Sequence, residues 1–260
     1  MATALDLSGR VVLVTGGVRG VGLGITHAFL RAGATVVTCS RTAPEALPVA
    51  EPVETPATHV VADVCDPESV TALVEGIVAE HGRLDVLVNN AGGAPYALAA
   101  DASPRFHAKV VDLNLLAPLL LSQAANEVMQ RQDDGGAIVM VSSISATRPS
   151  PGTAAYGAAK AGIDSLVKSL AAEWAPRVRV NSIDVGLVRT EQSGSHYGGD
   201  AGVSAIEATI PLGRLARPDE IGNVALFLAS PLASYVSGAT IAAHGGGEPP
   251  PFLAAARSGG

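Results

Sequence analysis

Residues 11–22 read VVLVTGGVRGVG, an apolar run that passes directly into a glycine-rich turn. The first four residues have the composition of a buried parallel strand, because helices cover both faces of such a strand and leave no polar alternation. Residues 21–30 then carry apolar side chains at helical spacing, and Gly33 ends this pattern. The stretch therefore predicts a strand, a tight turn and a helix in succession.

The same alternation of strand and helix continues to the end of the chain. Further strands are predicted at 34–39, 59–62, 84–89, 137–142, 178–183 and 239–242, and helices at 67–81, 103–131, 153–174 and 218–229. Seven strands alternating with helices predict an α/β fold with a Rossmann-type doubly wound parallel sheet and right-handed connections. No linker or repeat divides the sequence, so we expect residues 1–260 to form a single domain.

Three parts of the sequence depart from this regular pattern. Four prolines between residues 41 and 58 predict an irregular connection, because proline removes helix hydrogen bonds. Pro118 interrupts the helical pattern of 103–131. The glycines and polar residues of 187–212 predict a mobile segment over one edge of the sheet.

Composition limits the classes of function. Of 260 residues, 48% are hydrophobic and 16% are charged, which is enough apolar surface for a large core. The formal net charge of −7 argues against a nucleic-acid partner. Two cysteines outside any metal-ligand spacing predict neither a disulfide framework nor a metal site, and they favour a reducing cytoplasm. No leader pattern or long apolar run is present, so we expect neither secretion nor membrane association.

The glycine-rich turn Thr15-Gly16-Gly17-Val18-Arg19-Gly20-Val21-Gly22 is a candidate dinucleotide site. Glycines let backbone amides approach a pyrophosphate, and the start of the following helix adds partial positive charge. Its place between a strand and a helix favours this interpretation over a turn without a ligand.

Tyr156 and Lys160 are four residues apart on a predicted helix, so their side chains lie on one face. A cation at that distance favours a phenolate, whereas the alternative is a pair of solvated surface residues. Ser142 and Ser143 end the preceding strand, at the sheet edge where open α/β folds bind ligands, although a serine there is otherwise a turn or cap residue.

Two stretches contain asparagine at informative positions. Asn89-Asn90-Ala91-Gly92 follows a predicted strand, at the same edge of the sheet, and such residues are also common in turns. Asn114 lies between Leu113 and Leu115 in a predicted helix, where a buried amide must find hydrogen-bond partners. The alternative for Asn114 is one satisfied hydrogen bond in the core.

In combination, these motifs resemble the classical short-chain dehydrogenase/reductase family. The matching residues are Thr15-Gly16-x-x-x-Gly20-x-Gly22, Asn89-Asn90-Ala91-Gly92, Asn114, Ser143 and Tyr156-x-x-x-Lys160, in the family's order and spacing. Asp63-Val64 and the late stretch 214–238 extend the resemblance to nearly the whole chain. The resemblance implies an oxidoreductase that transfers a hydride between a nicotinamide cofactor and a carbonyl or secondary alcohol.

The resemblance also implies roles for individual residues. Tyr156 would be the general acid and base, and Lys160 would lower its pKa and hold the nicotinamide ribose. Ser143 would bind the substrate oxygen, and Asn114 would hold a water that connects Lys160 to solvent. The implied cofactor-binding residues are Gly16, Arg19, Gly20, Val21, Gly22, Ser40, Arg41, Asp63, Val64, Asn90, Ala91, Tyr156, Lys160, Val188 and Thr190.

The residue at the end of the second predicted strand indicates whether NAD(H) or NADP(H) is preferred. Relatives that prefer NAD carry an Asp there, which binds the ribose hydroxyls and repels a phosphate. This chain has Ser40, followed by Arg41, with Arg19 in the glycine turn. Two guanidinium groups without a carboxylate favour NADP(H) over NAD(H), unless both arginines are only solvated surface charges.

The sequence also departs from the family. Val185 replaces the usual proline before Gly186, His244 replaces an aspartate near the C-terminus, and the proline-spaced residues 41–58 replace a helix. These differences affect the turn beside the nicotinamide and the wall beside the adenine, and we expect His244 to be structural. They leave the four catalytic positions unchanged.

Substrate and assembly are less sharply predicted. The substrate wall is expected from residues 93–98, 145–151 and 187–212, and a moderately apolar ketone, a β-ketoacyl thioester and a steroid-like molecule are all compatible with it. The resemblance implies a homotetramer paired through 103–131 and 153–174, whose leucines need cover. The alternative function is a catalytically silent dinucleotide sensor or scaffold on the same fold.

Overall fold

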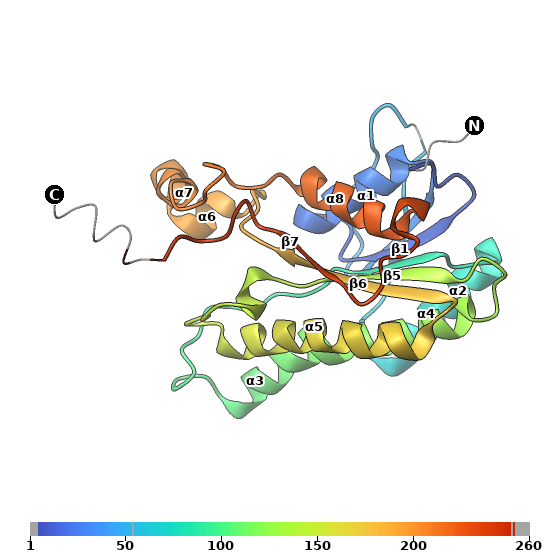
Figure 1. The fold of residues 1–260 in the computed structure, drawn as a ribbon, viewed down its shortest axis with the longest axis horizontal. Helices are drawn as coiled ribbons and strands as arrows, with labels where there is room; N and C mark the ends of the chain where they lie inside the picture. Colours follow the sequence, from blue (N-terminus) through green and yellow to red (C-terminus); the bar gives the residue numbers. More distant parts are fainter. Residues whose placement is uncertain (1–4, 54, 251, 253–260) are drawn as a thin grey trace.

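A parallel sheet of seven strands forms the centre of the molecule (Figure 1). The computed structural model describes residues 5–53, 55–250 and 252. Within them the strands are β1 (Val11–Thr15), β2 (Thr35–Ser40), β3 (Thr58–Val61), β4 (Val86–Asn89), β5 (Gly136–Val141), β6 (Val178–Val185) and β7 (Thr240–Ala243). Their order is β3-β2-β1-β4-β5-β6-β7, so the winding direction reverses between β1 and β4. The predicted doubly wound parallel sheet is confirmed.

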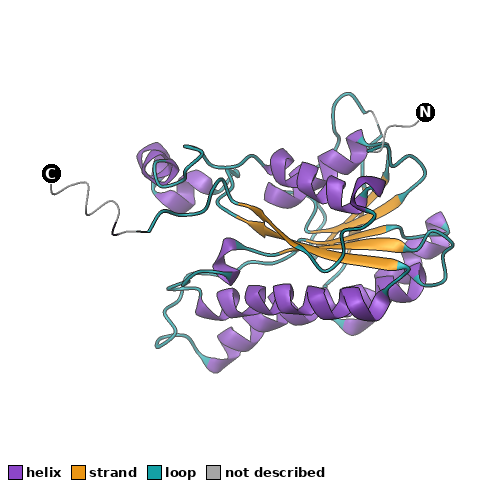
Figure 2. Cartoon of the chain, viewed as in Figure 1, coloured by secondary structure: helices purple, strands orange, loops and turns teal. Residues whose placement is uncertain are grey.

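Helices cover both faces of the sheet (Figure 2). They are α1 (Gly20–Arg31), α2 (Pro67–His81), α3 (Pro104–Val111), α4 (Ala117–Met129), α5 (Ala154–Trp174), α6 (Ser193–Tyr197), α7 (Gly199–Glu207) and α8 (Pro218–Ala229). One core lies between the sheet and α1 with α8, and a second lies between the sheet and α2, α4 and α5. This covering on both sides explains why the buried strands show no polar alternation.

The ends of α2 show how local residues set a boundary. The Asp66 carboxylate accepts a hydrogen bond from the Glu68 amide at the start of the helix, and Pro67 occupies its first position. Gly82 ends the helix in the left-handed conformation, with φ 76°. These signals act within one turn of the chain, and the predicted helix 67–81 is confirmed.

The predicted helix 103–131 is divided into three pieces. A π-helical turn, Asp112–Leu116, joins α3 to α4, and Pro118 lies in the first turn of α4. Proline has no amide proton, but an amide in the first turn of a helix has no intrahelical acceptor. No hydrogen bond of α4 is therefore lost at Pro118, and the helical path continues past it.

The segment 187–212 is more regular than the sequence predicts. The sequence assigned no helix to it, yet it contains α6 and α7, which meet at Gly198 and Gly199 with φ values of 82° and 77°. Val203, Ile210 and Leu215 form a small apolar cluster beneath them. The glycines that suggested irregular chain therefore serve as the joint between two short helices.

The apolar helical run Pro104–Met129 is long enough to cross a membrane by length and composition alone. Core helices pass the same test, and 39% of the apolar window in this run is buried. Leu121, Ala125 and Met129 pack in the core beneath the sheet. This helix is a weak indication of a membrane span, and the absence of membrane association stays a prediction.

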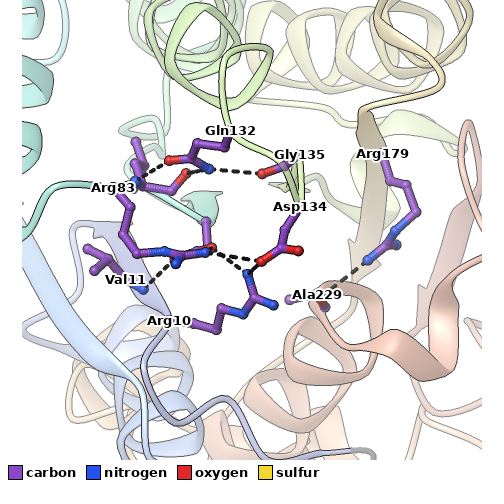
Figure 3. Close-up of polar contacts among 10 residues, drawn as sticks. Arg10, Val11, Arg83, Gln132, Asp134, Gly135, Arg179 and Ala229 are labelled. Atoms are coloured by element: carbon purple, nitrogen blue, oxygen red, sulfur yellow. Dashed lines mark hydrogen bonds and ion pairs between the residues drawn. The ribbon is translucent and has the colours of Figure 1, made fainter.

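A polar network closes the edge of the sheet where the strands begin (Figure 3). The buried Asp85 carboxylate accepts hydrogen bonds from Arg10, from Arg83 and from the Val11 amide, at 2.6–2.9 Å. Asp134 accepts a further bond from Arg10 at 2.7 Å. The predicted strand 84–89 starts two residues late, at Val86, although the Asp85 main chain already bonds to Val11 and Ala137.

Candidate active site

The residues with candidate catalytic roles come together at the carboxyl edge of the sheet. Ser143 hydrogen-bonds Tyr156, and the Lys160 Nζ lies 5.6 Å from the centre of the Tyr156 ring. A Cβ atom added at Gly92 would lie 2.7 Å from Asn114 Oδ1 and 3.4 Å from Lys160 Nζ. Asn114 and Lys160 therefore approach the loop that follows β4, and Tyr156 lies close to both Lys160 and Ser143.

Burial dominates the electrostatics of Tyr156 and Lys160. It raises the pKa of the Tyr156 phenol, while the hydrogen bond from Ser143 opposes this shift. Burial lowers the pKa of Lys160 to about 8, and the nearby Asp164 carboxylate opposes that shift. Lys160 Nζ donates to the Val141 carbonyl at 2.7 Å. An ammonium placed this way is fixed in position, and it titrates close to neutral pH.

Asn114 is fully buried and acts as a clamp between two backbone segments. Its Nδ2 donates to the Val110 and Gly93 carbonyls, each at 2.9 Å, and its Oδ1 accepts from the Gly93 amide at 2.8 Å. Both amide protons are thus used by the main chain. Only the second lone pair of Oδ1 is left for a water, so the side chain mainly holds the loop at Gly93 in place.

The glycine turn after β1 forms a cradle with no room for side chains. Gly16 has φ +63°, and a Cβ atom at Gly22 would overlap the Gly16 carbonyl oxygen and lie 2.5 Å from Asn90 Nδ2. The first turn of α1 has neither a capping side chain nor an acidic residue. Exposed helix amides behind a bare backbone suit an anionic pyrophosphate, so the residues present fit a dinucleotide.

Thr15 and Asn90 tie this cradle to the loop after β4. The Thr15 hydroxyl oxygen accepts hydrogen bonds from the Asn90 and Ala91 amides at 3.0 and 2.9 Å. Asn90 Nδ2 returns a bond to the Thr15 carbonyl at 2.8 Å. Asn89 points the other way and binds Ser122 on α4 at 2.9 Å. The two asparagines therefore have different tasks, since Asn90 shapes the cradle and Asn89 anchors β4.

The predicted adenosine side of the site lies at the ends of β2 and β3. Ser40 Oγ donates to the Thr42 carbonyl at 2.7 Å. Arg19 and Arg41 are exposed, and neither forms an ion pair within the described chain. Asp63 is exposed after β3, and Val64 is buried. The guanidinium groups of Arg41, directly after β2, and of Arg19, directly before α1, are thus without a carboxylate partner among the described residues.

The chain after β6 returns to the glycine turn. Val188 is buried and bridges Ala216, and the Thr190 methyl would lie 3.5 Å from a Cβ atom at Gly20. Val185, at the family's proline position, is the last residue of β6 and pairs with Ala243. A valine can take part in the strand there, whereas a proline would remove a donor.

Two of the predicted substrate walls meet beside this site. Ala97 donates to the Gly152 carbonyl at 2.8 Å, and the Tyr96 ring lies directly against Gly152, which has φ +78°. A cavity of about 450 Å³ is lined by residues of 145–151 and by Ala154, Gly157, Ala158 and Ala161 of α5. Neither Tyr156 nor Lys160 lines this cavity, because those side chains point from a different face of the helix.

Sequence reasoning missed an acidic pair between α5 and β6, of which Asp184 is buried and Asp164 is half-buried. Asp184 on β6 is 5% exposed and lies beside Asp164. Burial and the Asp164 carboxylate raise the pKa of Asp184 to about 6. The Ser182 hydroxyl donates to Asp164 at 3.1 Å, and His244 contributes an opposing, favourable charge effect on Asp184. The signal available was a charged residue directly after the predicted strand 178–183, which the structure extends to Val185.

We expect Asp184→Asn to increase stability at high pH. The folded pKa of Asp184 is raised, so the stability that its neutral form contributes is present below pH 4 and is lost as pH rises through about 6. Asparagine stays neutral, which should give a gain of about 1.4 kcal/mol at pH 8 relative to pH 5. Thermal melts at both pH values, with the exposed Asp101→Asn as the control, measure this difference. A variant whose offset from the natural protein is the same at both pH values contradicts the prediction.

Comparisons with known proteins agree with this geometry. A family model described as enoyl-(acyl carrier protein) reductase matches residues 16–248. D-threitol dehydrogenase of Mycolicibacterium smegmatis is 39% identical over 244 residues, covering 92% of this chain and 93% of that protein. The 3alpha-hydroxysteroid dehydrogenase of Mediterraneibacter gnavus is 35% identical over 245 residues, covering 92% and 97%.

The fold comparison leads to the same family. A crystal structure of a short-chain type dehydrogenase/reductase from Mycobacterium marinum has a TM-score of 0.87 with 33% identity, covering 95% of this chain and 98% of that one. Sequence and structure agree over nearly the full length. The chain therefore belongs to the classical short-chain dehydrogenase/reductase family and is an oxidoreductase of the kind that interconverts CH–OH and C=O groups.

Proposed function

We propose that this protein is an NADP(H)-dependent oxidoreductase that uses Tyr156 as general acid and base on a carbonyl or secondary alcohol. The observation that carries the proposal is the meeting of Ser143, Tyr156, Lys160 and Asn114 around Gly92. A phenol has an ordinary pKa of about 10, and it becomes a useful base near neutral pH only beside a fixed cation and hydrogen-bond donors.

Each of the four side chains has its own role in proton transfer to or from the substrate oxygen. Ser143 donates a hydrogen bond to the substrate oxygen and orients it toward the Tyr156 hydroxyl. In reduction, Tyr156 gives its proton to that oxygen, and the Lys160 ammonium stabilises the phenolate that remains. Asn114 holds the loop at Gly93 so that Lys160 keeps its position. The bound nicotinamide supplies or accepts the hydride.

The cofactor is held by three parts of the chain. Gly16, Arg19, Gly20, Val21 and Gly22 would hold the pyrophosphate, together with the α1 amides. Asp63, Val64, Asn90 and Ala91 would hold the adenosine side, and Val188 and Thr190 the nicotinamide end. Ser40, Arg41 and Arg19 would bind the 2′-phosphate of NADP(H).

The preference for NADPH tests the cofactor assignment. We expect the affinity for NADPH to exceed that for NADH by at least tenfold, because two unpaired guanidinium groups attract a phosphate. Oxidation of both cofactors is followed by absorbance against ketones, diketones, quinones and acyl thioesters, with polyols and hydroxysteroids for the reverse reaction. Ser40→Asp, which introduces a carboxylate at this position, should reverse the preference. Equal KM and kcat values for the two cofactors in the natural protein would contradict the prediction.

Substrate, assembly and location complete the proposal. The relatives named above are a D-threitol dehydrogenase and a 3alpha-hydroxysteroid dehydrogenase, and for this chain the proposed substrate class is a carbonyl compound or secondary alcohol. The chain is proposed to be one cytoplasmic domain with a mobile substrate segment, 187–212, assembled as a homotetramer. Leu116 on the helix face proposed for pairing is 51% exposed, whereas Leu170, which we expected to need cover, is buried in the monomer. The mass measured by light scattering tests the assembly.

A further inference from the structure

His59 on β3 contacts the residue at the end of β2 that determines cofactor preference in the proposed function. Its Nδ1 lies 2.9 Å from the Thr38 hydroxyl, and its Nε2 lies 3.2 Å from the Ser40 hydroxyl. Thr38 is fully buried, and both Ser40 and His59 are half-buried. The ring thus spans the last part of β2 from the neighbouring strand.

The Thr38 and Ser40 hydroxyls each have a main-chain acceptor besides the ring. Thr38 Oγ1 can donate to the Thr58 carbonyl at 2.9 Å, and Ser40 Oγ can donate to the Thr42 carbonyl at 2.7 Å. A hydroxyl has one proton, so while both of these bonds are formed the two oxygens can only accept from the ring. Both nitrogens of His59 then donate, which is the arrangement of the positively charged imidazolium.

The neutral ring needs a different arrangement. It has one N–H, so one of the two hydroxyls must turn its proton away from its carbonyl and toward the unprotonated nitrogen. Ser40 is the one that can turn, because its contact is the longer of the two and its side chain is only half-buried. Protonation of His59 therefore changes both the charge beside Ser40 and the direction of its hydroxyl.

We propose that His59, acting through Ser40, sets how strongly the protein discriminates a 2′-phosphate from a 2′-hydroxyl, and that this discrimination is greater when His59 is protonated. The proposal rests on the proposed function, in which Ser40 adjoins the 2′ position of the ribose. A charged ring adds a cation to the site beside Arg41 and Arg19 and strengthens phosphate binding. A neutral ring removes that charge.

Two features of the surroundings act on the pKa of His59 in opposite directions. Burial lowers its pKa from the ordinary 6.5, and a hydrogen bond with the Thr42 carbonyl opposes this shift. The groups that face the ring are the Thr38 and Ser40 hydroxyls from β2 and the Thr42 carbonyl from the segment that follows. Arg41, which is exposed, is the charged residue next to Ser40, and no carboxylate in the described chain contributes to the shift.

The test compares binding of two nucleotides that cannot react. Calorimetry measures the dissociation constants of adenosine 2′,5′-diphosphate and adenosine 5′-monophosphate at pH 5.5, 6.5 and 8, and their ratio gives the discrimination. The proteins are the natural chain, His59→Gln, and His81→Gln at the far end of α2 as a matched control. Because the phosphate itself titrates near pH 6, only the ratio of natural to variant discrimination at each pH reports on His59.

The expected result is a discrimination about fivefold higher in the natural protein than in His59→Gln at pH 5.5, falling toward equality at pH 8. His81→Gln should follow the natural protein. As a second measurement, the imidazole proton signal of His59, identified by its loss in the variant, should show a higher pKa with adenosine 2′,5′-diphosphate bound than with the monophosphate.

Equal discrimination in the natural protein and His59→Gln at every pH, or a His59 signal unchanged by the 2′-phosphate, would overturn the inference and leave the proposed function intact. If the natural protein binds neither nucleotide, both the inference and the proposed cofactor site are wrong.

Discussion

Tyr156→Phe is expected to lower kcat by about 10²- to 10⁴-fold, the usual contribution of a positioned proton donor. The variant removes one oxygen and keeps the ring, so the Lys160 ammonium retains the same aromatic neighbour at 5.6 Å. Ser143 still reaches the substrate oxygen, but no acidic proton is left to neutralise it during hydride transfer. The loss should therefore appear in kcat far more than in cofactor affinity.

The measurement follows NADPH oxidation with the best substrate of the panel, together with NADPH binding by fluorescence. Tyr235→Phe is the matched control, because Tyr235 is fully exposed and should give unchanged rates. A Tyr156→Phe enzyme with more than a tenth of the natural kcat would contradict the assigned role. If both proteins bind NADPH tightly and neither turns over any substrate, the silent sensor or scaffold becomes the better explanation.

The second large effect is expected at the opposite edge of the sheet, where Asp85→Ala should destabilise the fold by about 2–4 kcal/mol. Asp85 is 5% exposed and accepts four hydrogen bonds, from Arg10, twice from Arg83 and from the Val11 amide. Its removal leaves the buried Val11 amide without an acceptor and leaves two neighbouring guanidinium groups with only the exposed Asp134 as a counter-charge. The range is below that of a fully buried pair because the two arginine side chains are about one-third exposed.

Denaturant unfolding of Asp85→Ala and the natural protein measures this loss. Asp134→Ala is the control, since Asp134 binds the same two arginines but is 57% exposed, and we expect little change from it. Two variants with equal stabilities would contradict the assignment of most of the stabilisation to the buried carboxylate. The site residues are at the other edge of the sheet, so NADPH binding by folded Asp85→Ala should be unchanged.

The sequence by itself determined those features that depend on residues close together in the chain. Helix α2 begins and ends at signals within one turn of its boundaries, namely Asp66, Pro67 and Gly82. The i, i+4 spacing of Tyr156 and Lys160 and the glycine turn after β1 are equally local, and the order of strands and helices follows from periodicity. The family motifs, and with them the doubly wound sheet, could therefore be predicted without the structure.

Tertiary structure decided whatever depends on residues far apart in the sequence. Three contacts join residues that are far apart in the sequence. Asp164 lies beside Asp184, Arg10 donates to Asp85, and His59 contacts Ser40. No local pattern marks these pairs, because only the packing of strands and helices brings their side chains together. The pKa shifts have the same origin, since burial of Lys160 and Asp184 arises when α5 closes over the sheet. A sequence specifies local hydrogen bonds and apolar faces directly, whereas distant polar contacts and their electrostatics follow from the assembled fold.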